Sequence, residues 1–158
     1  GKAYALLAIA VIGVLLVGTS GSIAALSSML FPSETLAEGI SKDFSAASNI
    51  LLRLRLSHPI LSIATSVYLI FIAAWLRVQS ANDPGVARWS NILSIFVLVQ
   101  VAFGAATLLT LAPIVMQLGH LLLADLLWIA FVLMAANYFS KRTTTKNHFA
   151  ETIASSDA

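Results

Sequence analysis

The chain has 158 residues, of which 59% are hydrophobic and 10% are charged, and its mean hydropathy is +0.92. A soluble domain carries roughly a quarter charged residues, so this composition excludes a water-soluble globule and predicts an integral membrane protein. At roughly 20 apolar residues per span, the length accommodates four helices and leaves no room for a further soluble domain.

The chain contains no cysteine, and its formal net charge is +2 at pH 7. The lack of cysteine excludes disulfide bonds, thiolate-bound metals, iron–sulfur clusters and thiol nucleophiles. The few charges are spread over the ends of the apolar runs, which gives no basis for a nucleic-acid partner. We therefore expect an all-α membrane protein, a four-transmembrane-helix bundle in the lipid bilayer.

The first span is predicted from about residue 3 to residue 30. Its second half contains the small residues Gly18-Thr19-Ser20-Gly21-Ser22, which allow a neighbouring membrane helix to approach closely. Phe31-Pro32 ends this helix, because proline cannot continue it. Residues 33–50 form the longest polar stretch, and we interpret them as a loop on the membrane surface.

The second span is predicted over about residues 50–78 and contains His58. A turn-rich connection leads to a third span over residues 89–112, and Pro113 marks a very short connection to the fourth. The fourth span covers about residues 114–139 and contains His120 and Asp125. Residues 1–140 are thus expected to form one four-helix transmembrane domain. Residues 141–158, which include His148, are expected to form a polar, mobile cytoplasmic tail.

Orientation follows from the basic residues, because loops rich in Lys and Arg stay in the cytoplasm. With four spans, both termini share one side with the connection between spans two and three. That side holds Lys2, Arg77, Arg88, Lys141, Arg142 and Lys146, whereas the other holds Lys42, Arg53 and Arg55. We therefore predict a multi-pass protein, favouring a prokaryotic plasma membrane, with both termini cytoplasmic.

The most informative residues are two histidines that enter the membrane from the same side. His58 lies roughly two turns inside its span and His120 a similar distance after Pro113, so both lie within roughly 10 Å of the outer boundary. Polar residues at such a depth are usually functional, and imidazole is a good axial ligand for heme iron. We predict a heme toward the outer face, between His58 and His120. Arg53 and Arg55 lie toward the water, where guanidinium groups could pair with heme propionates.

Other interpretations stay open for each of these residues. Each histidine could be a packed side chain bonded to a neighbouring helix, and the two arginines could be interfacial anchors. Zinc or copper fits less well, because two ligands are too few and no carboxylate or cysteine lies at that depth. Asp125 lies about 140° around the helix from His120. It could therefore serve a second-shell bond, a proton path or packing against Gln100. His148 is interpreted as a solvated side chain.

Several motifs in order resemble one family, the heme A synthases, over about residues 10–135. The motifs are Gly18-Thr19-Ser20-Gly21-Ser22, Leu30-Phe31-Pro32-Ser33, Leu52-Arg53-Leu54-Arg55-Leu56-Ser57-His58-Pro59, Gln100-Val101-Ala102-Phe103-Gly104-Ala105-Ala106-Thr107-Leu108-Leu109, Ala112-Pro113 and Gly119-His120-Leu121. Heme A synthases oxidise a methyl group of heme O to the formyl group of heme A, the cofactor of cytochrome oxidases. Most are two similar four-helix halves in tandem, each with a histidine pair.

This chain resembles the C-terminal half, which in that family holds an electron-transferring heme b. The resemblance implies heme b on His58 and His120, and heme O and heme A as substrate and product. It also implies a partner, which would be a second four-helix half, a homo-oligomer or a larger membrane complex.

The departures from the family pattern limit the catalytic prediction. Arg55 stands where the catalytic half carries a glutamate, three residues before the second-helix histidine. Asn49 stands where C-terminal halves often carry a further histidine, and the outer-loop cysteine pair is missing. These departures favour an electron-transfer role for this chain within an oxidoreductase. We expect the isolated half not to be catalytic, and we assign no catalytic residue. The alternatives are a non-catalytic cytochrome b-type accessory subunit of a respiratory or photosynthetic complex, and a structural four-helix protein without heme.

Overall fold

The computed structural model describes residues 1–45 and 49–156, with side chains up to Lys141. The described residues form helices only, in the order α1 (Lys2–Leu30), α2 (Leu36–Phe44), α3 (Ile50–Arg55), α4 (Ser57–Gln79), α5 (Pro84–Leu109) and α6 (Ile114–Ser156). Four apolar stretches in them are long enough to cross a membrane: Lys2–Leu30, Ile50–Gln79, Pro84–Leu109 and Ile114–Lys141. The predicted four-span, all-α architecture is confirmed.

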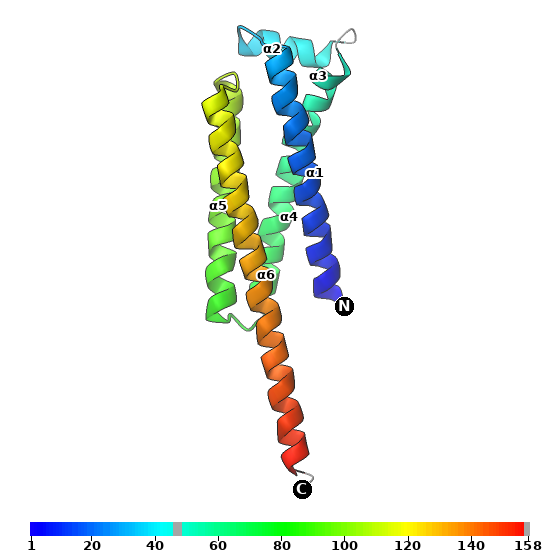
Figure 1. Cartoon of the computed structure of the whole chain (residues 1–158), viewed down its shortest axis with the longest axis vertical. Helices are drawn as coiled ribbons and strands as arrows, with labels where there is room; N and C mark the ends of the chain where they lie inside the picture. The colour runs from blue at the N-terminus through cyan, green and yellow to red at the C-terminus, as the bar shows by residue number, and fades with distance from the viewer. Residues whose placement is uncertain (46–48, 157–158) are drawn as a thin grey trace.

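The four spans pack most extensively on their neighbours in the chain. α1 packs on α3 and α4, α4 packs on α5, and α5 packs on α6, whereas α1 and α6 are not an extensively packed pair. Figure 1 shows α1 in front of α4 and α6 in front of α5, with α2 lying across one end of the bundle. We call this end the α2 end. α1 and α6 meet at the other end of the bundle, where Tyr4 stacks on Phe139 with ring centroids 4.4 Å apart.

The apolar core fills the half of the bundle away from the α2 end, which we call the packed half. Its largest fully buried side chains include Ile72 and Leu76 of α4, Leu93 of α5 and Met134 of α6. In the other half, which we call the histidine half, several buried residues are polar. They are Ser20, Ser27, Asp43 and Thr107.

The helix break between α3 and α4 follows from Pro59. Proline has no N–H and its ring collides with the carbonyl four residues earlier, here that of Arg55. α3 accordingly ends at Arg55, Leu56 is a turn residue, and α4 begins at Ser57. The break lies directly before His58 and allows α3 to leave the axis of α4.

The predicted surface loop is wrong for residues 36–44, which form α2. Thr35 caps this helix by accepting a hydrogen bond from the Glu38 backbone N–H at 3.2 Å, and the Glu38 carboxylate accepts one from the Glu34 N–H at 2.8 Å. This resembles a capping box, a known signal for a helix start. A hydrogen bond and ion pair from Lys42 lower the pKa of Glu38 below its ordinary value. α2 is therefore a short surface helix with its own local support.

Two four-residue connections join the remaining spans: residues 80–83 lie between α4 and α5, and residues 110–113 lie between α5 and α6. Asp83 caps α5 by accepting hydrogen bonds from the Gly85 and Val86 N–H groups, and Pro84 occupies the first helical turn, as favoured at helix starts. α5 therefore begins at Pro84, five residues before the predicted start of the span. α6 continues as helix to Ser156 through the range predicted to be a tail. No glycine or proline follows Gly119 to stop it.

Candidate functional site

His58 lies in the first turn of α4 and faces α1. Its Nδ1 is 3.2 Å from the Val17 carbonyl oxygen and 3.3 Å from the Ser20 hydroxyl. The carbonyl can only accept, so the proton belongs on Nδ1 and Nε2 keeps its lone pair. A Cβ on Gly21 would lie 3.1 Å from the imidazole ring. The small residues of α1 therefore let the ring pack directly on the helix backbone.

His120 lies in the second turn of α6 and is enclosed by one face of α5. Its ring is stacked on Phe103, with centroids 6.3 Å apart and planes at 7°. A Cβ on Gly104 would lie 2.9 Å from the ring, closer than real contacts allow. The Gln100 amide nitrogen donates to the His120 carbonyl oxygen at 3.0 Å and lies 3.4 Å from the ring Nε2. Because that amide nitrogen can only donate, it favours an unprotonated Nε2 on His120 as well.

The structure brings the two predicted histidines together. Their ring centroids are 6.3 Å apart and their planes are nearly perpendicular, at 86°. An imidazole nitrogen binds a first-row metal at about 2 Å and lies about 1 Å from its ring centroid, so two rings on opposite sides of one ion have centroids roughly 6 Å apart. The spacing of the pair therefore fits a single metal ion between the rings. Among the residues described, no group of three His, Cys, Asp or Glu side chains comes together.

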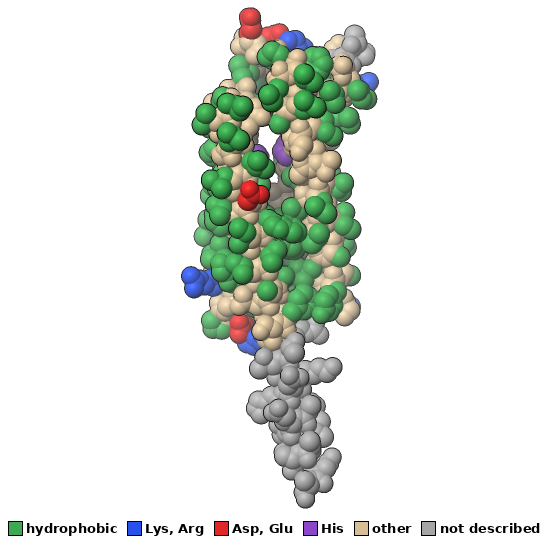
Figure 2. All heavy atoms as spheres, in the orientation of Figure 1, with side chains coloured by type: hydrophobic (Ala, Val, Ile, Leu, Met, Phe, Trp, Pro, Cys, Tyr) green, Lys and Arg blue, Asp and Glu red, His purple; other side chains and the backbone are tan. Residues whose placement is uncertain are grey.

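Space for a flat group lies beside this pair. Figure 2 shows a cleft in the face formed by α1 and α6, with histidine side chains at its margins toward the α2 end. The Nδ1 of His120 is buried and has no hydrogen-bond partner in the described part of the chain. The cleft, the close packing of the two rings on Gly21 and Gly104, and the ring spacing together fit a heme. The imidazoles of His58 and His120 would hold it.

The two predicted arginines differ in their surroundings. Arg55 forms an ion pair with Asp43 and donates to the Gly39 carbonyl oxygen at 3.3 Å, so it holds α2 against α3. Its Nε is buried without a hydrogen-bond partner. Arg53 is exposed. The structure thus assigns Arg55 an anchoring contact that sequence reasoning missed, because Asp43 lies on a separate helix.

Two other predicted candidates lie apart from the pair. Asp125 is exposed, and no hydrogen bond or ion pair joins it to the described residues, so packing against Gln100 is not what the structure shows. The side chain of His148 lies outside the described residues. From the sequence, Gln100 was considered only as one possible polar partner of Asp125, whereas in the structure it bonds His120. Gln100 lies four residues before Gly104, so the two share the face of α5 that meets His120.

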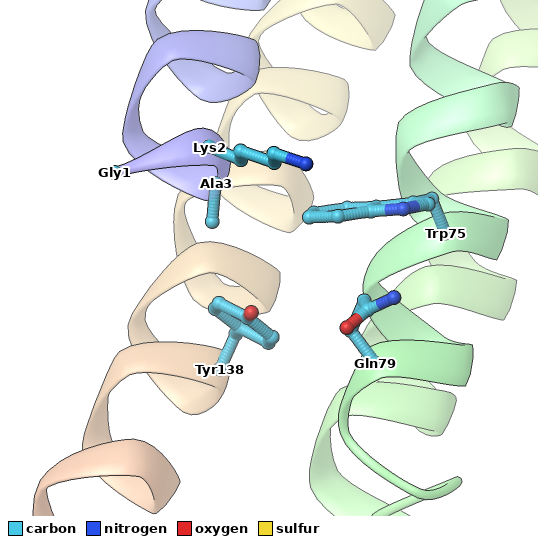
Figure 3. Close-up of a pocket in the computed structure, with 6 residues that line it drawn as sticks. All are labelled: Gly1, Lys2, Ala3, Trp75, Gln79 and Tyr138. Carbon is cyan, nitrogen blue, oxygen red and sulfur yellow. The ribbon is translucent and has the colours of Figure 1, made fainter.

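A second cavity lies at the opposite end of the bundle. It has a volume of about 530 Å³ and is lined by Gly1, Lys2, Ala3, Trp75, Gln79 and Tyr138. Figure 3 shows Trp75 and Gln79 of α4 across this space from the start of α1 and from Tyr138 of α6. Neither histidine lines it. The histidine pair and this cavity are therefore separate features.

The fold and the site define a four-span membrane protein with a half-buried histidine pair near one end of the bundle. The sequence profile of the COX15-CtaA family, described as cytochrome oxidase assembly protein, matches residues 2–132. The chain belongs to this family, the heme A synthase family. The predicted resemblance is confirmed.

Two curated relatives come from two strains of Thermus thermophilus, and both are named protoheme IX farnesyltransferase. Each is 30% identical to this chain over 126 residues, which is 80% of this chain and 21% of the relative. The chain therefore spans about a fifth of the length of the curated relatives it matches. No solved structure matches the chain.

Proposed function

We propose that this chain is the heme b-binding unit of a heme A synthase-like protein, in which the heme serves electron transfer during conversion of heme O to heme A. The observation that carries the proposal is the histidine pair, with ring centroids 6.3 Å apart and perpendicular planes. Family membership supports it, because the family acts in cytochrome oxidase assembly. A heme iron with two imidazole ligands supplies reversible one-electron transfer.

The residues around the pair have defined tasks in this proposal. The Val17 carbonyl holds the Nδ1 proton of His58, a contact that fixes the ring and would leave Nε2 free to bind the iron. Gln100 holds the backbone of His120 through its carbonyl, and Phe103 stacks on the His120 ring. Gly21 and Gly104 keep the rings close to the helix backbones. These tasks need only contacts that the described residues already make.

The arginines are proposed to receive the heme carboxylates at the α2 end. Arg55 still has a buried, unpartnered Nε while its Nη2 binds Asp43, and Arg53 is exposed nearby in sequence. Guanidinium groups bind carboxylates through charge-assisted hydrogen bonds. We propose that the α2 end faces outward and that both termini are cytoplasmic.

An isolated unit is proposed to hold heme without oxygenating it. Arg55 occupies the position three residues before His58, and the carboxylate brought nearest to it, Asp43, is already paired with it. Among the described residues, no carboxylate is therefore offered to the histidine pair as a general base. A second four-helix unit, of the same or a related sequence, would supply the oxidising site.

The first test is a reduced-minus-oxidised absorption spectrum of the chain expressed with ample heme. We expect the sharp α band of low-spin heme b, lost in His58→Ala and in His120→Ala. His148→Ala is the matched control and should keep the band. A wild-type chain without the band, or a band that survives both substitutions, would contradict the proposed site.

A second test separates a synthase unit from a cytochrome b-type accessory subunit. The chain is expressed with a source of heme O, alone and together with a complete heme A synthase lacking its own C-terminal histidine pair. Pigment extraction should show heme A only in the second case, and only with His58 and His120 intact. No restoration of heme A, despite a normal heme b spectrum, would favour the accessory subunit.

A further inference from the structure

Asp125 is a carboxyl group inside a membrane span, and it has no partner among the described residues. It lies 11 residues after Ile114, about 16 Å along a helix that is apolar as far as Lys141. It is exposed, and no described residue bonds to it. A carboxyl group facing lipid at this depth is unfavourable, and such residues normally face another protein surface. The position of Asp125 therefore calls for a partner outside this chain.

The exposed face around Asp125 has the spacing of a helix-pairing surface. We call it the α6 seam, and its members share exposure and a heptad-like spacing along one side of α6: Leu118, Leu121, Leu122, Asp125, Ile129 and Val132. The buried side of α6, with Phe131 and Met134, points the other way toward the bundle. A single polar residue within an apolar seam is the device that sets register in paired helices.

The chemistry of the seam points to a second copy of the same chain. The described Lys and Arg residues of this chain lie at the ends of the membrane spans or in α2 and α3, so no basic side chain lies at this depth. A two-fold axis along the membrane normal places each residue of α6 beside its own copy at the same depth. A carboxylic acid donates one hydrogen bond and accepts others, so two such groups sharing a proton satisfy each other.

We propose that the α6 seam pairs with the α6 seam of a second copy, with Asp125 hydrogen-bonded to the partner's Asp125. Pairing through α6 removes the Asp125 carboxyl from lipid. The proposal rests on Asp125 and the seam alone, and it stands whether or not the histidines bind heme.

The absence of cysteine makes a direct test possible. Leu121→Cys introduces one thiol on the α6 seam, where the residue is 59% exposed. Leu98→Cys is the control on α5, at 63% exposure and 11 residues from the end of its span nearest the α5–α6 turn, the same separation that Asp125 has from the start of α6. In native membranes under mild oxidation, we expect a disulfide-linked dimer from Leu121→Cys at least fivefold more abundant than from Leu98→Cys. Equal cross-linking of the two variants would overturn the proposal.

Two substitutions of Asp125 test the role of its carboxyl group in the Leu121→Cys background. Asp125→Leu should reduce cross-linking about tenfold, because apolar packing between helices has little driving force in lipid. Asp125→Asn retains a donor and an acceptor and should keep at least half of the dimer. Leucine suits a membrane span, so helicity and the heme spectrum should be unchanged in Asp125→Leu. Undiminished cross-linking of Asp125→Leu would show that the carboxyl group does not make the contact.

Discussion

The two halves of the bundle are built for different tasks. In the packed half, buried Ile72, Leu76, Leu93 and Met134 meet in one apolar cluster. In the histidine half, the interior contains hydroxyl groups, an ion pair and two imidazoles beside a cleft. The difference shows that the packed half can hold the helices together while the other half stays open for a ligand.

The histidine half needs specific hydrogen-bond partners for its buried groups, whereas the packed half needs only side chains of complementary shape. Hydrophobic packing is non-directional and tolerates small shifts. A buried polar group without a hydrogen bond costs free energy, as the unpartnered Nδ1 of His120 and Oε1 of Gln100 do. The histidine half is therefore less stable as it stands, and a group that accepts a hydrogen bond from Nδ1–H of His120 or donates one to Oε1 of Gln100 would stabilise it.

The largest expected effect is in the packed half. Ile72→Ala removes a side chain with no exposure, and leaving a cavity there should lower the free energy of unfolding by about 2–5 kcal/mol. Ile63→Ala on the same helix is the control, because Ile63 is 59% exposed and should change little. Unfolding in mixed micelles with rising SDS measures both. The comparison between the halves fails if Ile72→Ala abolishes the heme spectrum in protein that is still folded.

The next largest effect concerns the attachment of α2. Arg55→Met leaves the Asp43 carboxylate buried without its partner, and breaking such a pair costs about 3 kcal/mol locally. α2 should detach, which limited proteolysis between residues 33 and 49 would detect. Arg53→Met, which removes an exposed arginine, is the matched control. Equal cleavage of the two variants would show that Arg55 does not anchor α2.

Sequence reasoning predicted the parts of this protein that depend on one helix at a time. Long apolar runs define the spans, and the direction of spans two and four brings His58 near His120, as the structure shows. Pro59 removes a backbone hydrogen bond at the level of Arg55, and α3 ends at that residue. These features follow from composition, helical rise and the chemistry of proline.

The remaining features depend on how helices meet, which one sequence does not determine. Arg55 could have pointed toward water or toward a heme, and its partner Asp43 follows only from the placement of α2. Gln100 bonds His120 rather than Asp125 because of the rotation of α5 against α6. The start of α2 was an exception, since Thr35 followed by Glu38 carries a capping signal that could have been recognised.

A smaller effect is expected from adding a side chain at the glycine on which the His120 ring packs. Gly104→Ala places a methyl group 2.9 Å from the His120 ring, so the ring must shift and heme affinity should fall about tenfold, or about 1.4 kcal/mol. Gly18→Ala is the matched control, because a Cβ there meets nothing within 4 Å. Heme titration followed by absorption measures both. Equal affinities would show that His120 need not keep its present position.

The smallest effect concerns the end of the packed half, where Lys141 forms an ion pair with Asp83 at 2.6 Å. The hydrogen bond from Lys141, supported by the Val86 and Gly85 N–H groups, lowers the pKa of Asp83 below its ordinary value of 3.8. A carboxyl group with a lowered pKa in the folded state stabilises the fold above its unfolded pKa, and this contribution is lost as the pH falls through the folded pKa.

We therefore expect the wild-type chain to lose a little stability in acid, over a window below about pH 4, as Asp83 becomes protonated. Asp83→Asn keeps a capping side chain for α5 but has no charge to lose, so the acid-dependent loss should be smaller in this variant. Unfolding midpoints in SDS between pH 3 and pH 7 give the comparison.

The matched control is Glu38→Gln in α2, where the pKa of the carboxyl group is also lowered but the helix lies outside the packed half. Since the unfolding midpoint reports the packed half, only Asp83→Asn should flatten the pH profile. The same flattening by both variants would mean that α2 and the packed half unfold as one unit.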